Sequence, residues 1–195
     1  MSVRRDLMTS LRLFLVLAVL CGGVYSVVVL GIAQGLFPRQ ANGSLVVVGG
    51  QVVGSALIGQ DFSGPDWFQG RPSATMSDDG SRAQPYNAAN SSASNLGPTN
   101  PDLGKQVQAA AQKLEIPLAQ VPPDLVESSG SGLDPDITPA AALVQVPAVA
   151  AARHVDPAAL RALVARLTRG PFLGMFGGPH VNVLELNLAL KSGRL

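Results

Sequence analysis

The segment LRLFLVLAVLCGGVYSVVVLGIAQGLFP, residues 11–38, decides how this chain is organised. No charged side chain lies between Arg12 and Arg39. About 20 apolar residues in a helix are enough to cross the hydrocarbon core of a bilayer, which is about 30 Å thick. We therefore expect one transmembrane helix over residues 13–37, which Pro38 and the Asn42-Gly43 turn bring to an end.

Three other readings of this segment fit less well. A cleaved signal peptide has an apolar core of about 7–15 residues, which is much shorter than this run. A lipoprotein site needs a small residue before the cysteine, whereas Leu20 precedes Cys21. A buried helix of a soluble protein would hardly be free of charge over such a length. Cys21 is then expected to pack as a small apolar residue at membrane depth.

Basic residues predict the orientation of the helix. Three arginines precede the apolar run and only Arg39 closely follows it. Because basic flanks stay in the cytoplasm, residues 1–12 are expected to be cytoplasmic and residues 38–195 to form an extracytoplasmic domain of a cell-membrane protein. The arginines on the inner side are Arg4, Arg5 and Arg12.

Small residues in the apolar run favour contact with other membrane helices. Gly22 and Ser26 are four residues apart, as are Gly31 and Gly35, and this spacing lets helices approach closely. At 100° per residue the two pairs face nearly opposite sides. Small residues are also common in membrane helices in general, so both readings stand.

The composition excludes several classes of function. Charged residues make up 14% of the chain and the net charge is +1, which gives no basic surface for nucleic acid. Two histidines and one cysteine are too few for a zinc site of the usual kind. His154 and His180 are the possible catalytic bases, but no motif surrounds either of them. Asp134 and Asp136 lack the further acids of a calcium loop and are expected to cap a helix or bond within a turn.

The remainder of the chain predicts a small mixed α/β domain. Gly49-Gly50 between two β-branched runs is a hairpin signal, and Thr75–Pro101 has the composition of a long loop. Thr138 and Asp156 are expected helix caps, and Pro147 is expected to interrupt or kink the helix that contains it. The expected elements are a hairpin within 44–59, a helix over 102–115, a short strand near 125–126, helices over 139–154 and 157–170, and a strand passing into a short helix over 181–193.

The glycine-rich string SSGSG, Ser128–Gly132, has two readings. Its backbone N–H groups could bind an anion, as phosphate loops do. It lacks the GK[ST] ending of a Walker loop, so a structural turn is favoured.

Four long motifs resemble the C subunit of the Kdp potassium-transporting P-type ATPases. The resemblance covers nearly the whole chain, with Trp67 where the family usually has tyrosine and a longer polar loop over 75–90. The motifs are GQDFSGPDWFQGRPSA (59–74), SNLGPTNPDL (94–103), ESSGSGLDPDITPAAALVQVPAVAAAR (127–153) and VNVLELNLAL (181–190).

The resemblance implies a non-catalytic accessory subunit of a high-affinity potassium importer. In that family an A subunit binds potassium and a P-type B subunit hydrolyses ATP through a phosphorylated aspartate. The C subunit is thought to hold the complex together, and it has been described as a catalytic chaperone that raises the ATP affinity of the B subunit. That role assigns ATP contact to the glycine-rich stretch, here Ser128, Ser129, Gly130, Ser131 and Gly132.

The expected topology conflicts with direct ATP contact. ATP is cytoplasmic, whereas one membrane helix places the whole domain on the other side, so an effect on ATP affinity would act through coupling between subunits. The proline- and asparagine-stiffened loop loses little entropy on docking and is the expected partner contact. Its residues are Asn95, Leu96, Gly97, Pro98, Thr99 and Asn100. The alternatives are a membrane-anchored extracytoplasmic binding module outside any pump, and a secreted or anchored enzyme.

Overall fold

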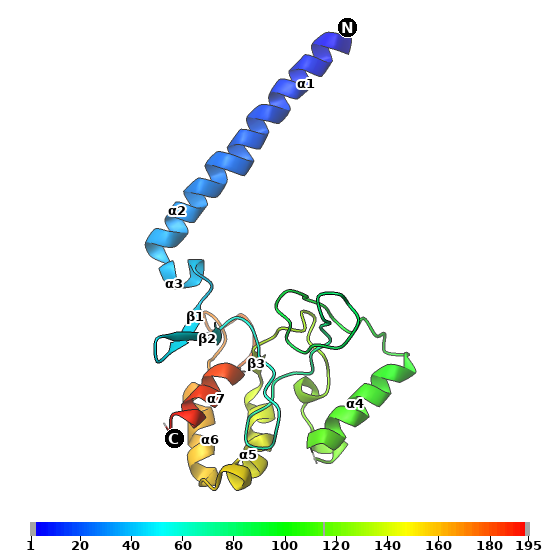
Figure 1. The fold of residues 1–195 in the computed structure, drawn as a ribbon, viewed down its shortest axis with the longest axis vertical. Coiled ribbons are helices and arrows are strands. Elements are labelled where there is room, and N and C mark those ends of the chain that lie inside the picture. The colour runs from blue at the N-terminus through cyan, green and yellow to red at the C-terminus, as the bar shows by residue number, and fades with distance from the viewer. Residues whose placement is uncertain (1–2, 115, 194–195) are drawn as a thin grey trace. The chain divides into compact units, whose positions relative to one another are not determined.

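The computed structural model describes residues 3–114 and 116–193 and divides into two compact units, residues 1–53 and residues 54–195 (Figure 1). Each unit is described by itself. Every side chain of the main hydrophobic core belongs to the second unit.

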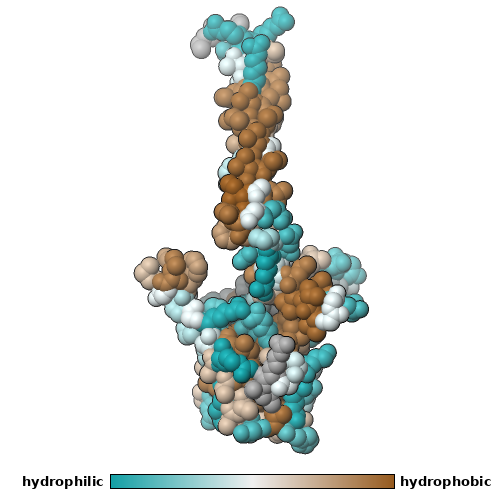
Figure 2. Space-filling view, turned by 90° about the vertical axis from the view of Figure 1, so that its left-hand side faces the viewer, coloured by the Kyte–Doolittle hydropathy of each residue, from teal (hydrophilic) through white to brown (hydrophobic). Residues whose placement is uncertain are grey.

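The first unit is dominated by one long apolar helix. It runs through α1 (Val3–Ala18), a π-helical segment (Val19–Tyr25) and α2 (Ser26–Leu36). Among the described residues this is the one helix long and apolar enough to cross a membrane. Its most apolar stretch of 18 residues has a mean hydropathy of 2.7, and none of that stretch is buried. Figure 2 shows apolar residues along most of its length. The helical segments run from Val3 to Leu36 and contain nearly all of residues 13–37, over which the transmembrane helix is expected.

The π-helical segment changes the geometry of the small residues. Gly22 lies within this wider turn, and Ser26 is the first residue after it. The Ser26 hydroxyl donates to the Cys21 carbonyl at 3.3 Å. A π turn uses i→i+5 bonds and rotates less per residue than an α turn. The offset calculated at 100° per residue therefore applies only outside this stretch.

A short helix and a hairpin follow the long helix. The helix α3 (Pro38–Ala41) precedes β1 (Leu45–Val48) and β2 (Gln51–Ser55). Gly49 and Gly50 have φ values of 59° and 82°. A two-residue turn with positive φ at both positions matches the twist of the strands, so the predicted Gly-Gly hairpin is confirmed.

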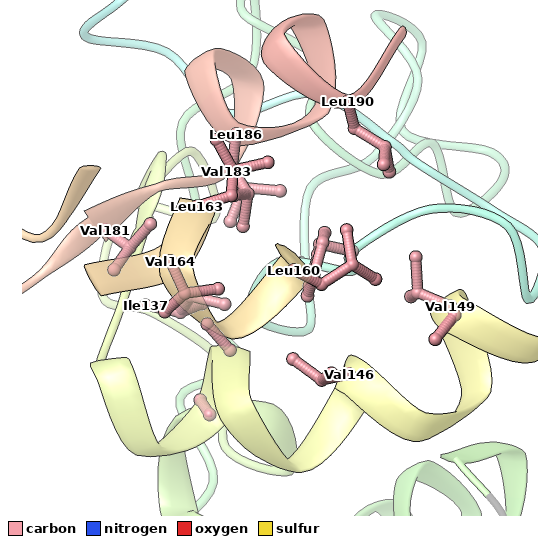
Figure 3. Close-up of a cluster of buried hydrophobic side chains, with 14 of the residues drawn as sticks. Ile137, Val146, Val149, Leu160, Leu163, Val164, Val181, Val183, Leu186 and Leu190 are labelled. Carbon is pink, nitrogen blue, oxygen red and sulfur yellow. The ribbon is translucent and has the colours of Figure 1, made fainter. Parts of the chain in front are cut away.

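Three helices build the core of the second unit: α5 (Pro139–Arg153), α6 (Pro157–Leu167) and α7 (Val183–Lys191). Each has a side-chain cap, since Thr138, Asp156 and Asn182 accept bonds from backbone N–H groups of the first turns. Their apolar faces meet in the cluster of Figure 3. The labelled side chains are Ile137, Val146, Val149, Leu160, Leu163, Val164, Val181, Val183, Leu186 and Leu190.

The sheets are very small. β3 (Asp136–Ile137) pairs antiparallel with β4 (Val181–Asn182), with Asp136 opposite Asn182, and β1 pairs only with β2. The predicted mixture of helices and small sheet content is confirmed. The apolar side chains of the core are supplied mainly by the three helices and not by a sheet.

Two local predictions also need correction. The strand expected near Leu125–Val126 is a 3₁₀ turn, η3 (Pro123–Leu125), because a proline lacks the N–H that a strand ladder needs. Helix α5 continues through the exposed Pro147, so of the two expected effects, interruption or a kink, interruption is wrong.

Helix α4 (Pro101–Leu114) confirms the predicted helix, whose last expected residue, Glu115, lies outside the described residues. The Asn100 side chain accepts from the Asp102 N–H at 2.9 Å, as a cap does. The 3₁₀ turn η2 (Leu118–Gln120) follows. The segment 75–100 before α4 has no helix or strand, in agreement with the predicted long loop.

Candidate functional site

Two buried amides hold the segment Trp67–Gln69, which belongs to the motif over residues 59–74, against the helical core. The side chain of Asn187 in α7 accepts from the Phe68 N–H at 3.0 Å and donates to the Phe68 carbonyl at 2.8 Å. The side chain of Gln145 in α5 does the same for Gln69, at 2.8 Å and 3.1 Å. Both amides thus act as a strand partner would, and the fully buried Phe68 ring fills the core between them.

The same segment carries a cation–π contact. The Arg153 guanidinium lies over the Trp67 ring, 4.1 Å from its centroid, and pairs with the Asp66 carboxylate at 3.6 Å. The Phe62 ring packs against Trp67 at 5.7 Å. The tryptophan at this position therefore has a partner for its face.

An open cleft of about 710 Å³ is lined in part by Trp67, Gln69 and Gln145. Its lining is mostly apolar, with Trp67 on one side and Leu143 on another, and Lys113 supplies a positive charge. Among the described residues that line it there is no set of acid, base and nucleophile.

Polar residues brace the long loop from inside. The Thr75 hydroxyl, which is 1% exposed, donates to the Gln84 carbonyl and accepts from the Asn87 N–H. The Ser73 hydroxyl donates to the Gly132 carbonyl at 2.7 Å. Buried hydrogen bonds of this kind replace an apolar core and give the loop one conformation.

The glycine-rich stretch docks on that loop. The Ser131 carbonyl accepts from the Ser92 N–H at 3.0 Å, and Ser129 is 4% exposed. Gly132 has a φ of 69°, and a Cβ there would lie 2.5 Å from the Ser92 carbonyl oxygen. The stretch from Ser128 to Gly132 is thus a turn whose carbonyls bind a neighbouring loop and whose last residue needs to be glycine.

A second polar cluster surrounds Tyr86. Its hydroxyl donates to the Arg71 carbonyl at 2.6 Å, and burial raises the pKa of Tyr86, with Asp134 adding to the rise. Arg71 pairs with Asp134 at 3.7 Å. Tyr86 therefore stays a neutral donor at physiological pH. Burial likewise raises the pKa of Asp136, against a lowering by His180.

The candidate catalytic and metal-binding residues are not brought together. His154 caps α5 in the left-handed conformation, and the His180 ring bonds to the Gly178 carbonyl at 3.0 Å. Asp134 accepts from the Asp136 N–H at 3.0 Å, which is the predicted turn bond. Over residues 3–114 and 116–193 no group of His, Cys, Asp or Glu could hold a metal ion.

The expected contact residues lie on accessible surface. In the loop 95–100, Asn95 adopts a positive φ of 54°, and the Asn100 N–H donates to the Gly97 carbonyl at 2.9 Å. Around Gly22, Gly31 and Gly35, apart from adjacent residues and the backbone of the same helix, no atom of the described residues lies within 4 Å of where a Cβ would be.

Known proteins resemble this chain along almost its entire length. The family described as "K+-transporting ATPase, c chain" matches residues 7–192. The chain belongs to the KdpC family. A KdpC subunit of a potassium-transporting ATPase from Rhodopseudomonas palustris is 52% identical over 195 residues, covering 96% of this chain and 97% of the relative. One from Methylobacterium nodulans is 53% identical over 193 residues, covering 95% and 96%.

Two structural residues of this KdpC chain escaped the sequence analysis. Asn187 and Gln145 sit within apolar helices, in the strings ELNLAL and ALVQVP. An amide on an otherwise buried face needs a hydrogen-bond partner, and that pattern was the available signal. It does not say which backbone the amide binds, since Phe68 is 119 residues away from Asn187 in sequence.

Proposed function

We propose that this chain is the accessory C subunit of an ATP-driven, high-affinity potassium import complex. Its family is that of the non-catalytic subunit, and the observation that carries the proposal is the match over residues 7–192. The alternative of an anchored binding module outside any pump does not account for the 52% identity to an ATPase subunit over 96% of the chain.

The proposed partners are a potassium-binding A subunit and an ATP-hydrolysing B subunit. Gly31 and Gly35 of the long helix have open space where a Cβ would be, as far as the described residues extend, so other membrane helices can pack closely there. The test is the double variant Gly31→Leu and Gly35→Leu, with Val28→Leu on the same helix as control. Affinity purification from membranes in mild detergent should recover the A and B subunits with the control and lose them with the double variant.

Full recovery with the double variant would remove the glycine pair from the interface. Failure of the unmodified chain to bring down an ATPase subunit would overturn the proposed function itself. The two results are therefore distinguishable.

The proposed topology has a cytoplasmic N-terminus and an extracytoplasmic domain. It is supported by the arginines before the apolar segment and by the single Arg39 after it. In a Cys21→Ser background, a cysteine placed at the exposed Ala109 should react with a membrane-impermeant maleimide in intact cells, and one placed at Ser10 should react only after lysis. The opposite pattern would invert the orientation.

The loop 95–100 is the proposed protein contact of the domain. Asn95 and the segment Gly97–Thr99 are exposed, and the cap at Asn100 fixes the loop at the start of α4. Replacing Asn95 and Thr99 by lysine should weaken recovery of the partner subunits, whereas lysine at Gln108 on α4 should not. Equal recovery in both cases would exclude the loop as a contact.

An effect on ATP affinity, as expected of a catalytic chaperone, is proposed to act through assembly. Ser128–Gly132 use carbonyl groups to hold the loop before α4, which supports a structural role for this stretch. In the assembled ATPase, Gly130→Ala should leave the KM for ATP unchanged, because the added methyl group meets nothing within 4 Å. Saturable binding of ATP to the purified chain, lost in a Ser128→Ala and Ser129→Ala variant, would instead assign nucleotide contact to this stretch.

A further inference from the structure

A hairpin over residues 169–180 connects α6 to β4. We call it the tip hairpin. Arg169 pairs with His180 at its base, and Phe172 pairs with Phe176 near its end. The two phenylalanines exchange both backbone hydrogen bonds, at 2.9 Å and 3.0 Å. The segment therefore has a defined shape.

The end of the tip hairpin exposes large apolar side chains. Phe172 is 71% exposed, Leu173 72%, Met175 76% and Phe176 61%. No charged side chain occurs between Gly170 and Pro179. Single exposed apolar residues are ordinary, but a contiguous group of four marks a contact with a membrane or with another protein.

The backbone at this end is suited to an apolar environment. The N–H groups of Phe172, Gly174, Met175 and Phe176 all donate to carbonyls within the hairpin, and Pro171 has no N–H. Polar backbone groups have to be satisfied internally before a segment can enter lipid. Most of the backbone N–H groups at the end of the hairpin therefore already have hydrogen-bond partners.

The charges around the tip hairpin favour an anionic surface. No acidic residue occurs from Pro157 to Leu184. Arg161 and Arg166 on α6 and Arg169 at the base of the hairpin are exposed, and both Arg166 and Arg169 also have interactions within the chain, in the case of Arg169 with Glu185. Apolar side chains flanked by arginines are typical of segments that lie at the interface of anionic lipids.

The bilayer is always within reach of this domain. The long helix ends at Leu36 and the second unit begins at Gly54, so residues 37–53 are the entire connection. Even fully extended, that length of chain spans no more than roughly 60 Å. The tip hairpin is thus held at high local concentration near the membrane.

We propose that the tip hairpin inserts Phe172, Leu173, Met175 and Phe176 into the interface of the bilayer that anchors the chain, with Arg161 and Arg166 of α6 and Arg169 at the base of the hairpin on the side of the anionic headgroups. The proposal rests on the proposed membrane anchoring and needs no partner subunit. It gives the domain a second attachment to the membrane besides its helix.

The experiment uses the full chain reconstituted in vesicles of phosphatidylcholine, with and without phosphatidylglycerol. In a Cys21→Ser background, Met175→Cys carries an environment-sensitive NBD probe, and Ala109→Cys on α4 carries the control probe. Lipids with a doxyl quencher on the acyl chain should quench the probe at 175 and blue-shift its emission, more strongly with phosphatidylglycerol and less in high salt. The probe at 109 should show neither effect. Water-like, unquenched emission at 175 in anionic vesicles would overturn the proposal.

Two variants separate the causes. Phe172→Ser with Phe176→Ser should bring quenching at 175 down to the level at 109, while Arg161→Gln with Arg166→Gln should remove only the gain from phosphatidylglycerol. Unchanged quenching in the phenylalanine variant would contradict insertion of the tip. Circular dichroism checks that each variant is folded.

The assembled ATPase distinguishes lipid from protein. Quenching at 175 should persist in the complex. If the probe is exposed to water in the chain alone and becomes shielded, without quenching by lipid, only in the complex, the hairpin binds a groove on another subunit and the lipid assignment is wrong. Loss of the complex itself would count against the proposed function and leave the vesicle result intact.

Discussion

Single buried amides connect distant parts of this domain. Asn187 is 1% exposed and satisfies both backbone groups of Phe68, and Gln145 does the same for Gln69. An apolar side chain at either position would leave a buried N–H and a buried carbonyl without partners. Each such group costs about 1–3 kcal/mol, so the amides contribute more to stability than a surface hydrogen bond does.

Replacing Asn187 by leucine should therefore lower the free energy of unfolding by about 2–5 kcal/mol. Asn187→Asp retains the acceptor for the Phe68 N–H and loses the donor to its carbonyl. Urea unfolding followed by circular dichroism should rank the wild type above the leucine variant by that amount. A leucine variant as stable as the wild type would show that the amide pairing adds no stability.

The two glycines of the SSGSG string should respond differently to alanine. Gly132 has a positive φ, and a Cβ would clash with the Ser92 carbonyl, whereas space is open around Gly130. Gly132→Ala should destabilise the domain by about 1–3 kcal/mol and Gly130→Ala by less than about 1 kcal/mol. Thermal unfolding of the two variants side by side is the measurement. Equal effects would contradict the tight docking of this turn.

Asp79 provides a titration that reports on the polar loop. Hydrogen bonds from the Ser77 hydroxyl, and then from Ser81, lower the pKa of Asp79 to about 2. Because the folded-state pKa is depressed, the stabilisation is present above the unfolded value of 3.8 and is lost as pH falls toward 2. In NMR titrations Ser77→Ala should raise the pKa of Asp79 toward 3.8, and Ser91→Ala should not. An unchanged pKa in the Ser77 variant would remove that hydroxyl as the cause.

Among the elements, helix α5 contains a proline, Pro147, whose replacement is expected to stabilise the domain. Pro147 has no N–H to donate to the Leu143 carbonyl, yet the helix continues past it because its buried face, including Val146 and Val149, packs on α6 and α7. Pro139 sits at the first helical position, where a missing N–H costs nothing. Tertiary packing therefore outweighs a local signal that favours interruption.

Pro147→Ala should raise the free energy of unfolding by about 1–3 kcal/mol, since the helix regains a hydrogen bond at an exposed position. Pro139→Ala is the matched control and should give no gain. Thermal denaturation measures both. A fall in stability for Pro147→Ala would mean that the proline ring makes contacts that the helix needs.

At the scale of the molecule, the main hydrophobic core belongs to the second unit alone. The side chains of the main core lie between Phe68 and Leu190, so the first unit supplies none of them. Removal of residues 1–53 should leave a soluble domain whose urea midpoint matches that of the full chain in detergent. The same truncation should abolish recovery of the ATPase subunits. A truncated domain without a cooperative unfolding transition would show that the first unit is needed for folding.

The sequence by itself determined those features whose physical cause is local. The charge-free run after Arg12 indicated the long helix, Gly49-Gly50 the hairpin, and Thr138 and Asp156 the helix starts, because hydropathy, turn conformation and caps depend on neighbours within a few residues. Resemblance of the motifs identified the family. The tertiary structure alone decided that Pro147 stays inside a helix, that no strand forms near Leu125, and that Asn187 meets Phe68. These outcomes depend on burial and on hydrogen bonds between residues far apart in the chain, and such pairings exist only once the helices have packed.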